Sequence, residues 1–352
     1  MAYRSGAERR EQHDTAGTWR IVAPGHGCIA HSALIDWLVP GLLLFLMLAA
    51  ANPVRAQSQP GSGGFKISMD VEQVVLSVSA YKRNGNSVPD LEQQDFQVYE
   101  NGELQHINFF SRDDIPVTVG LVIDRSGSMR HKWGDVITAA TSFARTSNPQ
   151  DDMFLISFNE KPLLGLAGEE FTAKPFDLKL ALLRHPPDGQ TALYDATDLG
   201  MKQLAKGRWD KQALVILSDG GDNASQTTFR QILDAVERSH VIVYAVGIYD
   251  PRSDDPDPGV LKKLTRISGG AAFFPKAVER VAGICEQIAH DIRNQYMIGY
   301  TPANQKRDGS FRNIRVQAKD SRGRGLRVRT RAGYFAPAAD PPLDKAQASP
   351  PL

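Results

Sequence analysis

The sequence is short of several residues and patterns that would point to particular functions. It has only two cysteines, Cys28 and Cys285, in 352 residues, which excludes a disulfide-rich fold. Its formal net charge is +1, so no overall field favours nucleic acid or an anionic membrane. It has no Gly-Lys-Ser/Thr phosphate loop and no Gly-x-Ser-x-Gly hydrolase elbow, and the histidines from His106 to His290 show no metal-binding spacing. With 41% hydrophobic and 23% charged residues, the chain is an ordinary globular protein.

An apolar run at residues 38–51 is shorter than the ~20 residues that a membrane-spanning helix needs. Arginines precede this run, and the small-residue sequence Val54-Arg55-Ala56 follows it. The pattern predicts a secretory signal peptide over residues 1–56 and an exported protein, periplasmic or extracellular; an uncleaved N-terminal anchor is the alternative. Cleavage removes Cys28. Cys285 then remains on an apolar helix face, where we expect a buried core residue rather than a reactive thiol.

Two segments with a two-residue apolar period flank the middle of the chain. The first covers residues 65–114, after a Gly/Ser/Pro/Gln linker at 57–64, and contains the turn signal Asn101-Gly102. The second covers residues 295–335. Each has too few strands for a core of its own, so we expect the two to pair in one β-sandwich-like module. The Pro/Ala-rich residues 336–352 are expected to form a disordered tail.

Residues 115–294 alternate between buried-strand and helix patterns. Apolar runs such as Val117–Ile123 and Ala213–Leu217 predict strands, and the segments between the runs have apolar residues at helical spacing. This alternation requires a mostly parallel sheet with helices on both faces. The predicted fold class is therefore α/β, with a doubly wound, Rossmann-like sheet and the flanking β-sandwich-like module.

The loop after the first of these strands has a composition suited to a cation. Asp124, Ser126 and Ser128 directly follow the run, at the strand end where open α/β sheets form their ligand crevice. A carboxylate and two hydroxyls are hard oxygen ligands, which favour Mg²⁺, Mn²⁺ or Ca²⁺ over zinc or copper. An ordinary Asp/Ser/Gly turn is the structural alternative.

Two later loops favour the metal site. Thr191 stands just before a helix pattern, and Asp219 follows the strand Ala213–Leu217. With these loops, residues 115–294 resemble a von Willebrand factor type A domain, whose metal-ion-dependent adhesion site has the pattern Asp-x-Ser-x-Ser, then Thr, then Asp. The matched positions are Asp124, Ser126, Ser128, Thr191 and Asp219. The resemblance implies that the three hydroxyls contact the metal and that the two acids act directly or through water.

The order of segments also resembles a bacterial group of exported type A domain proteins. From the adhesion-type site we expect a non-enzymatic module that needs Mg²⁺, or Mn²⁺ or Ca²⁺, and captures an Asp or Glu carboxylate of a protein partner, because neutral hydroxyl ligands leave the cation much of its charge. The alternatives are an envelope scaffold with a structural metal and a metal-assisted hydrolase, for which His131 is the only candidate base. The candidate partner-binding residues are Arg125, Arg130, His131 and Asp222.

The C-terminal segment carries an arginine-rich stretch. On strands, Arg327, Arg329 and Arg331 would fall on one face. We expect a solvated face that discourages edge pairing rather than a phosphate-binding surface. No aromatic residues interleave with these arginines as stacking platforms, so nucleic acid is not an expected partner.

Overall fold

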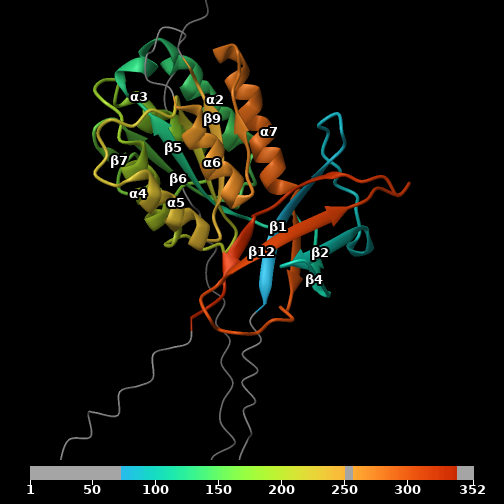
Figure 1. Ribbon diagram of the computed structural model, residues 1–352. Helices are drawn as coiled ribbons and strands as arrows, with labels where there is room; N and C mark the ends of the chain where they lie inside the picture. Colours follow the sequence, from blue (N-terminus) through green and yellow to red (C-terminus); the bar gives the residue numbers. More distant parts are fainter. Residues whose placement is uncertain (1–72, 250–256, 339–352) are drawn as a thin grey trace, which may run out of the picture. The chain divides into compact units, whose positions relative to one another are not determined.

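The computed structural model describes residues 73–249 and 257–338 (Figure 1). The expected signal peptide, which contains Cys28, and the linker lie outside the described residues. So do residues 65–72 of the first β segment and 339–352 of the expected tail. Among the residues that the structure describes, no helix is long and apolar enough to cross a membrane.

Six strands form the central sheet, and all are parallel except the edge strand β7. In spatial order they are β10 (Ala272–Phe273), β9 (Ile242–Gly247), β8 (Gln212–Ser218), β5 (Thr118–Asp124), β6 (Asp152–Phe158) and β7 (Pro162–Leu164). The strands β5, β6 and β9 are buried along their whole length. Their unbroken apolar runs follow from this burial on both faces.

Helices cover both faces of this sheet (Figure 1). On one face lie α2 (Trp133–Thr146), α3 (Pro175–Leu183) and α7 (Val281–Arg293), and on the other α4 (Leu193–Leu204), α5 (Phe229–Arg238) and α6 (Pro258–Ser268). Short 3₁₀ turns are η1 (Gln93–Asp95), η2 (Gly127–Lys132) and η3 (Val278–Arg280). The predicted α/β fold class is confirmed. Cys285 of α7 is fully buried, as expected, and burial raises the pKa of its thiol to about 12.

Two antiparallel four-stranded sheets form the flanking module. One has the order β13 (Arg327–Arg329), β1 (Val74–Tyr81), β11 (Tyr296–Tyr300) and β4 (Ile107–Ser111). The other has the order β14 (Gly333–Phe335), β12 (Phe311–Ala318), β2 (Phe96–Glu100) and β3 (Glu103–Gln105). Both sheets contribute to one core, with Leu76 and Val98 fully buried.

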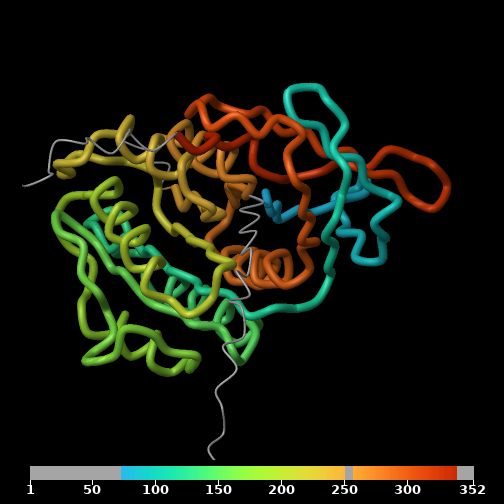
Figure 2. Tube along the Cα trace, turned by 90° about the horizontal axis from the view of Figure 1, so that it is seen from below, coloured from blue at the N-terminus to red at the C-terminus, as the bar shows by residue number. Residues whose placement is uncertain are grey.

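Each sheet of this module combines strands from both ends of the described chain. Val74 of β1 lies opposite Tyr300 of β11, and Val98 of β2 lies opposite Val316 of β12. Figure 2 shows the early and late segments side by side. The β-sandwich-like module built from N- and C-terminal segments is therefore confirmed. Asn101 and Gly102, with φ of 49° and 89°, form the turn between β2 and β3, as an Asn-Gly hairpin requires.

Arg329 and Arg331 join the sandwich to the α/β domain, which corrects the expectation of a solvated arginine face. Arg329 lies 2.7 Å from a carboxylate oxygen of Asp291 on α7 and contacts the hydroxyl of Tyr81. Arg331 donates to the backbone oxygen of Glu237 on α5 at 2.9 Å. The side-chain alternation is as predicted, but the α/β domain rather than water covers that face. Arg327 alone of the three is exposed.

Replacing Arg329 by Ala should lower the free energy of unfolding by about 2–3 kcal/mol, because it leaves the buried Asp291 carboxylate without its cation. The matched control is Arg327→Ala on the same strand, whose exposed side chain should contribute no more than about 0.5 kcal/mol. Urea unfolding followed by circular dichroism measures both values. Equal stability of the two variants would contradict the role of Arg329 in joining the modules.

Candidate metal site

Asp124 ends β5 and is fully buried. Its Oδ1 accepts a hydrogen bond from the backbone N–H of Ser126 at 2.8 Å, and its Oδ2 accepts one from Ser218 Oγ at 2.7 Å. Each carboxylate oxygen therefore has a fixed donor. Ser218 was not among the predicted site residues, although its position next to Asp219 is the signal that could have found it.

Asp219 directly follows β8, the strand that pairs with β5. Because Ile123 of β5 lies opposite Leu217 of β8, the two parallel strands end at the same edge of the sheet. Asp219 Oδ2 accepts a hydrogen bond from Ser128 Oγ at 2.9 Å, and Ser128 Oγ lies 3.1 Å from Ser126 Oγ. The loops after β5 and β8 are thus joined by the predicted ligands themselves.

Gly220, next to Asp219, has a φ of +86°, and a side chain there would lie 2.4 Å from the backbone oxygen of Asp257. Only glycine combines this backbone conformation with so close an approach. The turn places Gly221, whose N–H donates to Asp219 Oδ1 at 3.2 Å. Both oxygens of Asp219 are therefore oriented by the loops around them.

Thr191 reaches the site from the loop before α4. The N–H of Gly127 donates to the backbone oxygen of Gly189 at 3.0 Å, which ties this loop to the loop after β5. The N–H of Thr191 donates to Asn223 Oδ1 at 2.9 Å, which ties it to the loop after β8. The Thr191 hydroxyl has no hydrogen-bond partner among the described residues, although only 7% of the residue is exposed. An oxygen in this position can serve as a ligand.

The electrostatics of the site also suit a cation. Burial and the negative charge of Asp219 raise the pKa of Asp124 to about 6. Neither carboxylate forms an ion pair with a Lys or Arg of the described chain. No group of three or more His, Cys, Asp or Glu gathers within the described ranges. The donor set is therefore two acids with hydroxyls, which fits a hard divalent cation.

The predicted partner-binding residues lie in different environments. Arg130 and His131 are exposed on η2, and Arg130 forms a 3.1 Å ion pair with the exposed Asp188. Arg125 is only 9% exposed; its Nη2 donates to Asn159 Oδ1 at 3.0 Å and its Nε is buried without a partner. Asp222 accepts hydrogen bonds from the N–H of Tyr194 at 2.9 Å and from Ser225 Oγ at 2.6 Å. Asp222 therefore accepts a hydrogen bond from a backbone N–H of the first turn of α4, which has no acceptor within the helix.

Besides Ser218, two further residues that the sequence reasoning missed support or border the site. Glu160, after β6, accepts a hydrogen bond from the N–H of Gln190 at 3.0 Å and so fixes the Thr191 loop. Tyr249, after β9, has a buried hydroxyl without a partner, and burial and the charge of Asp219 raise its pKa. Both lie in polar connections that lack a recognisable pattern, so no signal in the sequence places them at this site.

Residues 118–287 match the family model of the von Willebrand factor type A domain. The α/β domain is therefore a domain of this type. A comparison with curated proteins gives no match.

Solved structures with a similar arrangement include three bacterial proteins. A von Willebrand factor type A protein from Catenulispora acidiphila has 13% identity and a TM-score of 0.46, and the match covers 76% of this chain and 72% of that chain. An aerotolerance-related membrane protein from Bacteroides fragilis has 14% identity and a TM-score of 0.41, and the match covers 50% of this chain and 98% of that chain. The vWF domain of the type V pili tip protein Mfa5 from Porphyromonas gingivalis has 13% identity and a TM-score of 0.41, and the match covers 51% of this chain and 95% of that chain.

The metal-free protein should lose stability as the pH rises through about 6. Asp124 has a higher pKa in the folded than in the unfolded chain. Its protonation therefore stabilises the folded state at a pH below the pKa of the unfolded chain. This contribution is lost as the pH rises and the carboxyl ionises in the folded state. From about pH 4 to about pH 7 the loss due to Asp124 should be about 2 kcal/mol. Urea unfolding in chelator, compared with Asp124→Asn, isolates this contribution. An identical pH dependence in the two proteins would contradict it.

Proposed function

We propose that this type A domain is part of an exported, divalent-cation-dependent protein-binding module that captures an Asp or Glu carboxylate of a partner. The observation that carries the proposal is the position of Ser128 Oγ, 2.9 Å from Asp219 Oδ2 and 3.1 Å from Ser126 Oγ. A serine hydroxyl that donates its proton to a carboxylate keeps its lone pairs for another group. The hydroxyls of this cluster are thereby suited to a cation.

In this proposal Ser126, Ser128 and Thr191 hold Mg²⁺, or alternatively Mn²⁺ or Ca²⁺. Asp124 and Asp219 balance the charge of the cation, directly or through water. A cation held by these residues would supply positive charge that a ligand from outside can approach. Because most direct ligands would be neutral hydroxyls, a carboxylate from a partner is strongly attracted to that charge.

Export is supported by the signal-peptide pattern of residues 1–56. The proposed place of action is therefore the periplasm or the cell exterior. Cys285, fully buried in α7, is compatible with an oxidising compartment because it is not accessible for disulfide exchange.

One observation weighs against the alternative of a purely structural metal in a scaffold protein. The loop of Thr191 is already bonded to both neighbouring loops, through Gly127 N–H and Asn223 Oδ1. These loops have direct hydrogen bonds that do not involve a cation. A metal-assisted hydrolase would need a base or nucleophile held beside the metal, and His131, the candidate, lies exposed on η2. We therefore propose binding rather than catalysis.

Removing hydroxyls should weaken metal binding without unfolding the protein. Ser126→Ala and Thr191→Ala should each lower Mg²⁺ affinity about tenfold or more, and the double variant further, because each lost oxygen is a proposed ligand. The matched control is Thr138→Ala on α2, which removes a hydroxyl that bonds only to its own helix. Calorimetry on the metal-free protein measures the affinities. Wild-type affinity in the double variant would reject this ligand set.

Binding of the partner should require the metal and an acid on the partner. A pull-down from envelope extract should recover the partner in Mg²⁺ but not in EDTA. The Asp219→Ala variant should fail to recover the partner even in Mg²⁺. Changing the essential Asp or Glu of the partner to Asn or Gln should have an effect as large as metal removal, because the amide lacks the charge.

The other outcomes of this experiment separate the alternatives. Binding that survives both chelation and every acid-to-amide change in the partner would overturn the proposal and favour a scaffold. A variant that still binds its ligand but no longer converts it would instead indicate an enzyme.

A further inference from the structure

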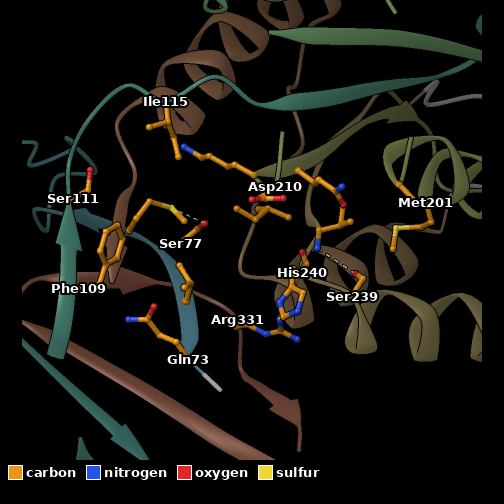
Figure 3. A pocket seen from close by; sticks show the side chains of 18 residues that line it. Gln73, Ser77, Phe109, Ser111, Ile115, Met201, Asp210, Ser239, His240 and Arg331 are labelled. Carbon is orange, nitrogen blue, oxygen red and sulfur yellow. Dashed lines mark hydrogen bonds between the residues drawn. The ribbon is translucent and has the colours of Figure 1, made fainter. Parts of the chain in front are cut away.

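A pocket of about 850 Å³ lies between the sandwich and the α/β domain, at the end of the central sheet opposite to the metal loops. One wall is the outer face of β1, β11 and β4; the other includes Asp210 and His240, which stand just before β8 and β9 (Figure 3). Sites for small molecules have volumes of roughly 300–1,000 Å³. The pocket is thus large enough for an organic ligand.

The sandwich wall of the pocket contains an apolar row, although it is the outer face of a sheet; Gln73, Ser77 and Ser111 of the same wall are polar. Val75, Gly299 and Phe109 lie side by side across β1, β11 and β4. Val75 is 38% and Phe109 43% exposed. Outer faces of antiparallel sheets are normally polar, and β12 of the other sheet follows this rule with Asn313, Arg315 and Gln317 exposed. The apolar row on this outer face therefore coincides with the pocket.

Gly299 stands in the middle of this row, where the neighbouring side chains leave no room for a larger residue. A Cβ at this position would lie 2.8 Å from the Gln73 side chain and 2.9 Å from Phe109 Cβ. Ile115, which also lines the pocket, is 36% exposed, so an apolar body against Val75 and Phe109 would find a second apolar contact.

A cationic group lies at another part of the lining, where Figure 3 shows Arg331 beside His240. The Arg331 guanidinium donates to the backbone oxygens of Gly333 at 2.6 Å and Glu237 at 2.9 Å, and lies 3.1 Å from His240 Nδ1. These acceptors are neutral, and no ion pair of the described residues involves Arg331; the carboxylate of Glu237 acts on the guanidinium only through its longer-range charge. A partly buried cation without a direct ion-pair partner favours an anion beside it.

We propose that this pocket binds an amphiphilic organic anion, with its acidic head at Arg331 and His240 and its aliphatic or aromatic body against Val75, Gly299 and Phe109. The other basic residue of the lining, Lys211, is only 6% exposed, its ammonium donates to the backbone oxygen of Ile292 at 2.5 Å, and the carboxylates of Asp114 and Asp151 act on its charge. Asp210, the carboxylate of the lining, is exposed. It disfavours an anionic head on its own side and so directs the head toward Arg331.

The experiment compares three probes of equal chain length on the full exported protein: laurate, dodecanol and dodecylammonium. Calorimetry below their aggregation concentrations should show saturable binding of laurate to one site. Dodecanol should bind about tenfold more weakly, because it lacks the charged head, and dodecylammonium more weakly still. The ratio of laurate to dodecanol affinity reports the charge recognition without any substitution in the protein.

Two variants locate the site. Ser77→Trp places a large side chain in the pocket from the outer face of β1 and should abolish laurate binding. Arg331→Gln should reduce the affinity for laurate about tenfold and leave the affinity for dodecanol unchanged. Arg315→Gln, on the polar outer face of β12, is the matched control and should bind all probes like the wild type. Thermal melting checks that each variant is folded.

The failing outcomes are distinct. No saturable laurate binding, unchanged binding in a folded Ser77→Trp variant, or equal affinity for the anion and the ammonium would each overturn the proposal. If Arg331→Gln does not fold, Ser77→Trp and the preference of the wild type among the three probes still decide the question.

Discussion

The buried pair of carboxylates, Asp124 and Asp219, is the constraint on which the organisation of the α/β domain depends. They follow neighbouring parallel strands that end at the same edge of the sheet, so their charges cannot move apart. Ser126, Ser128 and Ser218 each donate a hydrogen bond to one of these carboxylates. Despite these hydrogen bonds, burial and, after it, the repulsion by Asp219 raise the pKa of Asp124 to about 6. A divalent cation would supply the compensation that the protein itself does not provide.

The sandwich adds a second constraint, because the α/β domain is inserted between its two halves. Pairing Val74 with Tyr300 closes a loop that contains the whole α/β domain. Closure of such a loop carries a small entropic penalty if the compact domain has already brought its ends together. Arg329, paired with Asp291, and Arg293, paired with Asp114 at 2.7 Å, then fix the sandwich to that domain. The relative position of the two modules is thus set by charged side chains at the surface of the α/β domain, and this junction creates the pocket.

Sequence patterns were sufficient where one local rule decides the structure. Buried parallel strands need unbroken apolar runs, and strands of the sandwich need alternation, so the fold class and the joining of the two ends were predictable. Patterns failed where tertiary contacts decide. Helix α3 was not predicted, because Leu178 is buried while Leu183 on its opposite face is exposed, so no single apolar stripe is visible. Alternation placed Arg329 and Arg331 on one face but could not show that another domain covers it. The convergence of the three loops is likewise a property of the fold, and Glu160 becomes visible only there, whereas Ser218 could have been found from its position next to Asp219.

The distribution of charge at the candidate site bears on what a cation would do there. Both oxygens of Asp124 already accept hydrogen bonds from Ser126 and Ser218, so this carboxylate can balance a cation without direct contact. Hydroxyls, unlike carboxylates, leave the charge of the cation largely uncompensated on the side that faces away from the protein. A site intended only to hold loops together gains most from direct carboxylate ligands, which neutralise the ion. A site intended to attract an external acid gains from keeping that charge. The hydroxyl-rich arrangement of Ser126, Ser128 and Thr191 corresponds to the second case, and this is the physical reason for preferring capture of a partner over a structural metal.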